Sequence, residues 1–401
     1  MDVYMARQPI FDRNMSVFGY ELLYRKSMNN FYEGTDDNQA TAELINNAFL
    51  TMHFPELTGG GKAFINFSRD MLLNDIPMLL PAQLTVVEVL ERVEVDEDVV
   101  EACRELSEKG YIIALDDFVF SEQYLPLLEI AHIIKVEFPV VNHDDQRQLI
   151  KRYKNKVKFL AEKVETREEY QIAYDMGYDY FQGYFFSKPV IIKEKEIPPL
   201  NANLINIMKL LNHGDPEYQQ IAEIIETDLG LSFKLLKLAN TVCFGSKYEI
   251  RHLKQALVRL GFIEIKKWIY ILLMKETQTI ENKELIKTCF IRAKFMELMA
   301  MEIGADSIQF EYFLTGMFSS IDVLTNKDME EITNEIFLPD SVRDALLGQG
   351  SHIKYALDIV TNYELLIWDG LVLDKIADGA VRGDLVNMYM EALVWVMNLN
   401  Y

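Results

Sequence analysis

The chain has 401 residues, half of them apolar and a quarter charged, which is the composition of folded globular domains. Its formal net charge of −22 argues against DNA or RNA as a direct partner, because nucleic-acid binding requires Lys and Arg to neutralise phosphates. The sequence shows no apolar run long enough to span a membrane and no signal peptide, so we expect a cytoplasmic protein.

The spacing of apolar residues predicts two domains joined by a linker. The first, residues 1–189, alternates β-branched or aromatic runs with helix-like segments at 39–52, 96–109, 143–155 and 167–176. This alternation is typical of a largely parallel α/β sheet or barrel. Residues 190–200 carry alternating charges and two prolines, which indicates a linker. In residues 201–401 apolar positions recur at helical spacing, so we expect an all-α domain.

Polar residues stand at the ends of the strand-like runs of the first domain. They are Glu21, Asn66, Glu88, the pair Asp116 and Asp117, Lys135, Glu162 and Gln182, with successive gaps of 45, 22, 28, 19, 27 and 20 residues. Such gaps suit strand–helix–strand units, whose carboxyl ends converge on one mouth of a barrel. Each residue alone is more often a solvated strand-end cap, but their joint placement favours a shared site.

The chemistry of these side chains indicates metal-assisted chemistry at a phosphate group. Oxygen ligands that suit Mg²⁺ or Mn²⁺ come from Glu21, Asn66, Glu88, Asp116 and Glu162. Asp117 could bridge to a second ion, and two ions can activate a water for an in-line phosphodiester displacement. Lys135 could orient or deprotonate that water, and Gln182 could hold a ligand oxygen. Arg25 is a candidate phosphate clamp, because a guanidinium pairs bidentately with phosphate.

The first domain resembles an EAL domain, the phosphodiesterase module for the bacterial messenger cyclic di-GMP. The resemblance runs in family order through "RQPIFD" (7–12), "GYELLYR" (19–25), "FINFS" (64–68), "VEVLE" (87–91), "ALDDF" (114–118), "IKVE" (134–137), "LAEKVET" (160–166) and "FQGYFFSKP" (181–189). It implies a TIM-like barrel with Mg²⁺ or Mn²⁺ as cofactor and cyclic di-GMP as ligand.

The resemblance also assigns roles to individual residues. It implies metal ligands at Glu21, Asn66, Glu88, Asp116 and Asp117. Lys135 becomes the water-activating base, with Glu162 and Glu21 in the catalytic group. The residues expected at the ligand are Gln8, Arg25, Gln182 and Glu165, with Gln8 and Arg25 at its guanine and phosphate ends. Glu91 is expected to anchor the loop that follows Asp117.

The first domain departs from the family pattern beside these residues. After "DDF" the family has Gly-Thr-Gly, whereas this chain has Val119, Phe120 and Ser121, and β-branched Val resists backbone geometry that Gly permits. We expect a longer helix after the altered loop. Lys163 replaces a Gly and Glu137 replaces an Asp. These changes favour impaired or conditional catalysis, with ligand binding more robust than turnover.

The second domain resembles an HDOD domain, a helical relative of metal-dependent HD phosphohydrolases. The segments that carry the resemblance are 221–245, 250–268 and 312–324. Where an HD enzyme has its His-Asp ligand pair, this chain has Ser319 and Ser320, and hydroxyls cannot replace those ligands. We therefore expect an interaction module that binds a protein partner and performs no chemistry.

Three functions remain open from the sequence. The first is a degenerate or conditionally active regulator that binds cyclic di-GMP or a protein and reports through the helical domain. The second is a working phosphodiesterase that converts cyclic di-GMP to linear pGpG. The third is a barrel that binds no nucleotide and serves only protein contacts. The altered loop at 119–121 favours the first, and the retained ligand set with Lys135 favours the second.

Overall fold

The computed structural model describes most of the chain, in two compact units. The described residues are 4–25, 58–118, 124–183, 202–212, 216–240, 250, 252–279, 282–325, 327–335, 338–365 and 385–399. The contacts divide the chain into residues 1–190 with 355–401, and residues 191–354. The helix expected at 39–52, the linker at 190–200 and the altered loop at 119–121 lie outside the described residues. The predicted domain limits stay a prediction.

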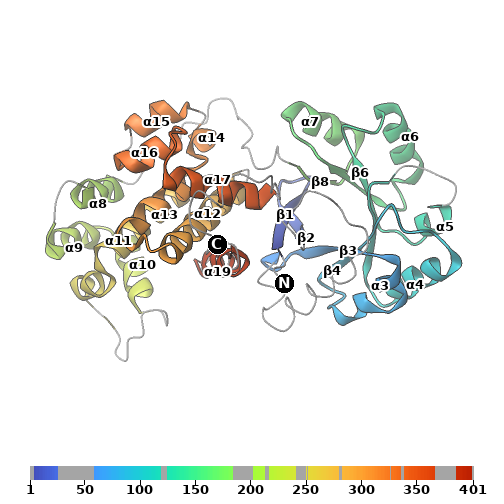
Figure 1. Cartoon of the computed structure of the whole chain (residues 1–401), viewed down its shortest axis with the longest axis horizontal. Helices are drawn as coiled ribbons and strands as arrows, with labels where there is room; N and C mark the ends of the chain where they lie inside the picture. The colour runs from blue at the N-terminus through green and yellow to red at the C-terminus, as the bar shows by residue number, and fades with distance from the viewer. Residues whose placement is uncertain are drawn as a thin grey trace. The chain divides into compact units, whose positions relative to one another are not determined.

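The first unit contains a closed eight-stranded barrel whose strands follow one another in chain order (Figure 1). They are β1 (Tyr4–Asp12), β2 (Val17–Arg25), β3 (Lys62–Phe67), β4 (Thr85–Val89), β5 (Ile112–Leu115), β6 (Ile133–Glu137), β7 (Lys158–Glu162) and β8 (Tyr180–Phe181). Strand β1 runs antiparallel to both β2 and β8, and all other neighbours are parallel. This arrangement confirms the predicted α/β barrel.

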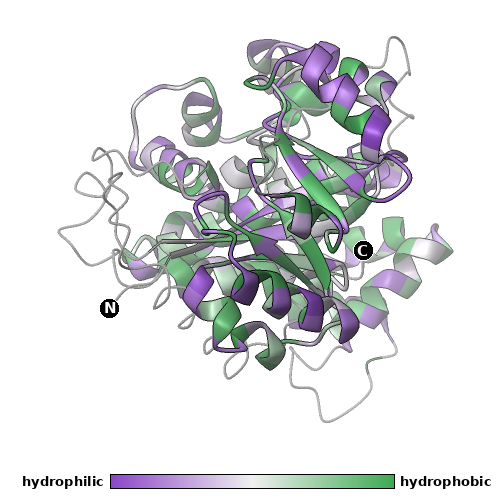
Figure 2. Ribbon diagram, turned by 90° about the vertical axis from the view of Figure 1, so that its right-hand side faces the viewer, coloured by the Kyte–Doolittle hydropathy of each residue, from purple (hydrophilic) through white to green (hydrophobic). Residues whose placement is uncertain are grey.

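Helices surround the barrel. They are α3 (Arg69–Leu73), the short η1 (Ile76–Leu79), α4 (Glu97–Glu108), α5 (Leu125–Leu128), α6 (His143–Tyr153) and α7 (Arg167–Met176). Three of them confirm the helices predicted from periodicity, and their starts carry side-chain caps from Asp96, Asn142 and Thr166. Figure 2 shows hydrophilic and hydrophobic residues alternating around these helices, as one apolar face packed on a barrel requires.

Period-two alternation along the strands builds two layers inside the barrel. The apolar layer contains Ile10, Phe64, Val86, Ala114, Ile133 and Leu160, all at most 2% exposed. Two residues further along β3, β4, β6 and β7 stand Asn66, Glu88, Lys135 and Glu162. Because side chains two positions apart point to the same side of a strand, the polar residues lie directly above the apolar floor.

The described residues beyond position 201 form helices and no strand, which confirms the predicted all-α character. The helices are α8 (Ala202–Asn212), α9 (Tyr218–Glu226), α10 (Leu229–Ala239), α11 (Leu253–Glu276), α12 (Lys283–Glu302), η5 (Asp306–Ile308), α13 (Gln309–Phe318), α14 (Ile321–Thr325), α15 (Met329–Glu335), α16 (Asp340–Leu346), α17 (His352–Leu365) and α19 (Leu385–Asn398). In the parts of the chain that the structure describes, no helix is both long and apolar enough to cross a bilayer.

Gly183, two residues after β8, allows the chain to lie against Val164, two residues after β7. Its φ is +151°, and a Cβ added there would lie 2.2 Å from the carbonyl oxygen of Val164. Gln182 donates its backbone N–H to Ala161, while Val164 donates its own to Gln182. The close backbone approach therefore fixes Gln182 at the mouth of the barrel.

We expect Gly183→Ala to destabilise the protein by about 3 kcal/mol or more, because backbone atoms cannot move aside as a flexible side chain does. The matched control is Gly110→Ala, where φ is +90° and an added Cβ meets nothing within 4 Å. That change should cost only the strain of the left-handed conformation, about 1–2 kcal/mol. Urea unfolding of both variants measures the loss of unfolding free energy. Equal losses in the two variants would contradict the claim that backbone contact at Gly183 excludes a side chain.

Candidate active site

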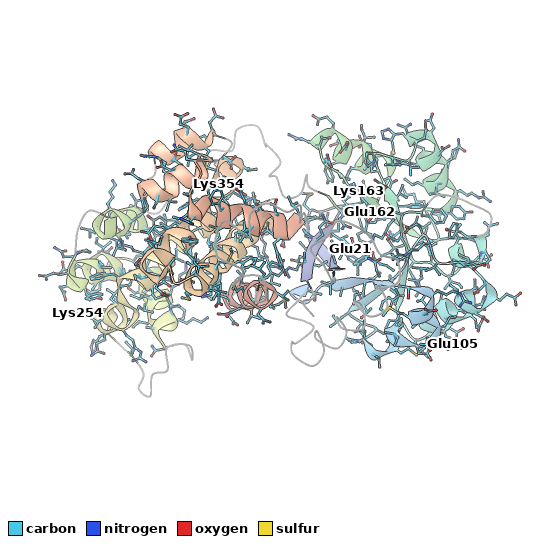
Figure 3. The ribbon with its side chains drawn as sticks, viewed as in Figure 1. Glu21, Glu105, Glu162, Lys163, Lys254 and Lys354 are labelled. Atoms are coloured by element: carbon cyan, nitrogen blue, oxygen red, sulfur yellow. The ribbon has the colours of Figure 1, made fainter. Side chains whose placement is uncertain are left out.

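The ammonium of Lys135 lies at the centre of the polar layer and is surrounded by carboxylates. Its Nζ atom is 2.7 Å from Glu88 Oε1, 2.7 Å from Asp116 Oδ1, 3.0 Å from Glu162 Oε1 and 3.6 Å from Glu21 Oε1. Lys135 and Glu88 are fully buried. Figure 3 shows Glu21 and Glu162 close together at the barrel, whereas Glu105 lies on the outer helix α4. The strand-end residues thus converge as the sequence predicted.

Gln182 links the first, second and last strands across the point where the barrel closes. Its side-chain Nε2 donates to Gln8 Oε1 at 2.7 Å and to Glu21 Oε2 at 2.6 Å. Gln8 and Glu21 are also direct partners in the β1–β2 register. These hydrogen bonds hold Glu21 with one oxygen toward Gln182 and the other toward Lys135.

Burial and crowding of charge shift the acid–base properties of the site. Burial raises the pKa of Glu88 well above its usual range, and Lys135 offsets this only in part. Burial likewise raises the pKa of Glu162 to about 8. Burial alone would lower the pKa of Lys135, but the carboxylates led by Glu162 and Glu21 raise it well above its ordinary value. Lys135 is therefore an ammonium ion at neutral pH in this arrangement.

The residues present fit a divalent cation. The buried oxygens Glu88 Oε2, Asn66 Oδ1 and Glu162 Oε2 have no hydrogen-bond partner among the described residues. Asn66 and Glu88 are also direct partners in the β3–β4 register. Buried oxygens without donors are costly, and carboxylate and amide oxygens are the ligands that hard cations prefer. Of the predicted ligands, Glu21, Asn66, Glu88 and Asp116 could hold such an ion here.

A second acidic group adjoins this cluster at the mouth. Carboxylate oxygens of Glu91, Asp116 and Asp117 lie within 4.8 Å of one another. Asp117 adopts a left-handed backbone with φ of 41°, which turns it away from the strand direction. Burial and the neighbouring Asp116 raise the pKa of Asp117. The sequence had assigned Glu91 only to anchoring a loop, and the structure adds its proximity to this pair.

An ion pair between two residues that depart from the EAL pattern borders the same mouth. Lys163 Nζ lies 2.8 Å from Glu137 Oε1, and their strands pair with Glu137 opposite Glu162. Both substitutions were visible in the sequence, but nothing there indicated that they contact each other. The signal that could have found the pair is that Glu137 ends β6 and Lys163 directly follows β7, and these two strands are neighbours.

Some predicted site residues lie outside the cluster, and the side chain of one lies outside the described part of the structure. Arg25 ends β2, but its side chain is not among the described ones. Glu165 is exposed, and its backbone N–H donates to Glu169 Oε2 at the start of α7. The roles of both at a ligand stay predictions. The helix expected to be longer after the altered loop is described only as α5, four residues from Leu125.

In the helical domain, a guanidinium contacts the two serines that replace the HD ligand pair. Arg292 Nη1 donates to Ser319 Oγ at 3.1 Å and to Ser320 Oγ at 3.0 Å. A Cβ added to Gly316 would lie 2.6 Å from backbone atoms of Arg292, so helices α12 and α13 approach closely there. A fixed positive charge beside two hydroxyls does not suit a divalent cation.

The raised pKa of Glu162 predicts a pH-dependent stability in the absence of metal. A carboxyl whose pKa rises on folding stabilises the protein fully below its unfolded value, about 4.5, and that contribution is lost as pH rises through about 8. Compared with Glu162→Gln, the wild type should therefore lose stability between about pH 5 and pH 8. Urea unfolding in EDTA tests this, and parallel pH curves for the two proteins would contradict it. Added Mn²⁺ should remove most of the difference.

Comparisons with known proteins agree with this geometry. The EAL domain model matches residues 61–189, and the HDOD domain model matches residues 197–338. The uncharacterised protein YuxH of Bacillus subtilis is 36% identical over 408 residues, covering 100% of this chain and 99% of YuxH. The cyclic di-GMP phosphodiesterase CdgJ of Vibrio cholerae is 32% identical over 401 residues, covering 99% of this chain and 93% of CdgJ.

Among solved structures, the calcium and cyclic di-GMP complex of Klebsiella pneumoniae BlrP1 is similar to part of the chain. The similarity covers 47% of this chain and 56% of that chain, at 20% sequence identity and a TM-score of 0.39. The assignment rests instead on the two domain matches in their order and on relatives that align along their whole length. The chain belongs to the family of proteins in which an EAL domain is followed by an HDOD domain.

Proposed function

We propose that this protein is a conditional phosphodiesterase of the cyclic di-GMP network, which binds cyclic di-GMP and hydrolyses it to linear pGpG when a divalent cation is bound. The observation that carries the proposal is the convergence of Glu21, Glu88, Asp116 and Glu162 on one buried lysine, with ligand oxygens left unpartnered. Relatives support it, since CdgJ is described as a cyclic di-GMP phosphodiesterase. A cytoplasmic location is part of the proposal.

The reaction adds water across one phosphodiester. The water oxygen bonds to phosphorus, the bond from phosphorus to the 3′ oxygen breaks, and the 3′ oxygen receives a proton. EAL domains are metal-dependent. A divalent cation held by Glu21, Asn66, Glu88 and Asp116 would neutralise phosphate charge and make a water more acidic. Mg²⁺ and Mn²⁺ both suit this set of oxygen ligands.

The residues of the chain would position the water and its proton. Lys135 is charged in the arrangement described here, so its Nζ forms ion pairs with the surrounding carboxylates and would orient an attacking water by donating a hydrogen bond to it. The role of general base that the EAL resemblance implies requires the pKa of Lys135 to fall, as an added positive charge nearby would cause. Glu162, whose pKa is raised to about 8, could accept or release a proton near neutral pH.

Hydrolysis should require Mn²⁺ or Mg²⁺, and Glu21→Ala and Lys135→Met should each reduce it by about a hundredfold or more, the usual loss when a positioned catalytic group is removed. Glu105→Ala is the matched control, because Glu105 is on the outer face of α4 and contacts none of the site. Chromatography of cyclic di-GMP and pGpG over time measures turnover. Full activity in Glu21→Ala would contradict the proposed active site.

A second candidate is a regulator that binds cyclic di-GMP without turning it over. The substitution of Val119, Phe120 and Ser121 for Gly-Thr-Gly favours it, because this loop follows the ligand pair Asp116 and Asp117. Calorimetry with cyclic di-GMP and Ca²⁺ separates the candidates when read beside the turnover assay. Binding without turnover under Mn²⁺ would favour the regulator, and no heat at high micromolar nucleotide would leave only protein contacts for the barrel.

We infer that the helical domain binds a protein partner and performs no metal chemistry. The contact of Arg292 with Ser319 and Ser320 supports the absence of metal chemistry, since a guanidinium stands beside the positions where HD enzymes carry their ligands. The full chain with Ser320→Ala should therefore bind as many Mn²⁺ ions as the wild type, as measured by equilibrium dialysis. Loss of one ion per chain in that variant would contradict the inference.

A further inference from the structure

Lys163 occupies a fixed place at the mouth of the barrel. Two backbone hydrogen bonds flank it, from Phe138 N to Glu162 O at 3.1 Å and from Val164 N to Gln182 O at 3.0 Å. Between them Lys163 adopts a left-handed conformation with φ of 56°. Both flanking bonds reach neighbouring strands, so the backbone of Lys163 is held from two sides. Its side chain therefore starts from a defined position and direction.

The side chain of Lys163 lies at the acidic rim of the mouth and is partly exposed to solvent. Its Nζ is 2.8 Å from Glu137 Oε1, and its charge also interacts with Asp117 and Glu162. In Figure 3, Lys163 and Glu162 are labelled side by side on the barrel. Lys163 thus adds a permanent positive charge to the region that would hold divalent cations.

We propose that Lys163 is a built-in counter-ion that lowers the affinity of the mouth for divalent cations, so that cation concentration sets how much of the protein is metal-loaded. The inference rests on the proposed metal-dependent function and deepens it by naming a regulator of the same site. Lys163 acts through its charge on the cation and on Asp117, and it is not a group that touches substrate.

Electrostatics determine the direction and the size of the effect. A divalent cation near Asp116 and Asp117 is repelled by a nearby ammonium and competes with it for the same carboxylates. The Lys163 side chain is 58% exposed, so solvent and salt screen much of this repulsion. We therefore expect removal of the charge to tighten Mn²⁺ binding by roughly two- to fivefold at low salt, the range typical of exposed charge pairs.

The substitutions at Glu137 and Lys163 support a joint role of these two residues in setting the metal affinity. Glu137 and Lys163 are both substituted relative to the EAL motifs, and they form an ion pair with each other. Glu137 pairs with this ammonium at 2.8 Å, and its carboxylate offsets part of the positive charge beside Asp117. A lysine there without this partner would compete more strongly with a cation. The pair therefore sets an intermediate metal affinity.

The chain offers a matched control on the same strand. Lys158 begins β7 at the opposite end of the barrel, its side chain is also 58% exposed, and its Nζ is 2.7 Å from Asp179 Oδ1. Lys158→Gln thus removes the same charge, with the same exposure and a similar ion pair, far from the mouth. Lys163→Arg keeps the charge, and like Lys163→Gln it leaves the left-handed backbone strain in place.

The test is a Mn²⁺ titration of the full chain without nucleotide, following free Mn²⁺ by electron paramagnetic resonance at low and high salt. Lys163→Gln should bind Mn²⁺ roughly two- to fivefold more tightly than the wild type at low salt and show a smaller difference at high salt. Lys163→Arg and Lys158→Gln should both match the wild type. This pattern separates the effect of the local charge on Mn²⁺ affinity from the effects of net charge and of backbone strain.

Unchanged affinity in Lys163→Gln would overturn the inference, as would an equal gain in Lys158→Gln or in Lys163→Arg. Absence of Mn²⁺ binding in every variant would overturn both this inference and the metal assignment. Absence of cyclic di-GMP turnover, with the affinity pattern intact, would remove only the proposed hydrolysis. The two proposals can therefore fail independently.

Discussion

The buried ammonium of Lys135 is the interaction on which the barrel mouth depends. Four carboxylates point toward its Nζ atom, and Glu88 among them is fully buried. Without a positive charge, carboxylates crowded at low dielectric would repel one another or take up protons. Burial raises the pKa values of Glu88 and Glu162, and Lys135 offsets this rise only in part, because one ammonium faces four carboxylates. The remaining negative charge is what a divalent cation would neutralise.

Much of this site could be predicted from the sequence because side chains along a strand point to the same side at every second residue. Once a strand end is recognised, its inward polar residue stands two positions beyond an inward apolar one, as with Phe64 and Asn66 or Ile133 and Lys135. Parallel pairing then brings those residues to one mouth. The convergence of the predicted acids at the barrel mouth followed from this rule. Gln182 joined them through hydrogen bonds that the rule does not specify.

The remainder depends on loop conformation, which the sequence does not determine locally. Asp117 and Lys163 both adopt left-handed backbones although neither is Gly, and these conformations decide where their side chains point. The contact between Lys163 and Glu137 joins residues that are 26 positions apart, counted from 137 to 163. The meeting of Glu91 with Asp116 and Asp117, and of Arg292 with Ser319, depends equally on tertiary packing.

Diffraction from crystals grown with Mn²⁺, recorded at the manganese absorption edge, tests the central claim most directly. We expect an anomalous peak bounded by oxygens of Glu21, Asn66, Glu88 and Asp116, with the Nζ of Lys135 displaced from at least one of the carboxylates it contacts here. Peaks only at surface carboxylates, with the ion pairs of Lys135 unchanged, would show that these acids are gathered to bury a lysine and not to hold a metal.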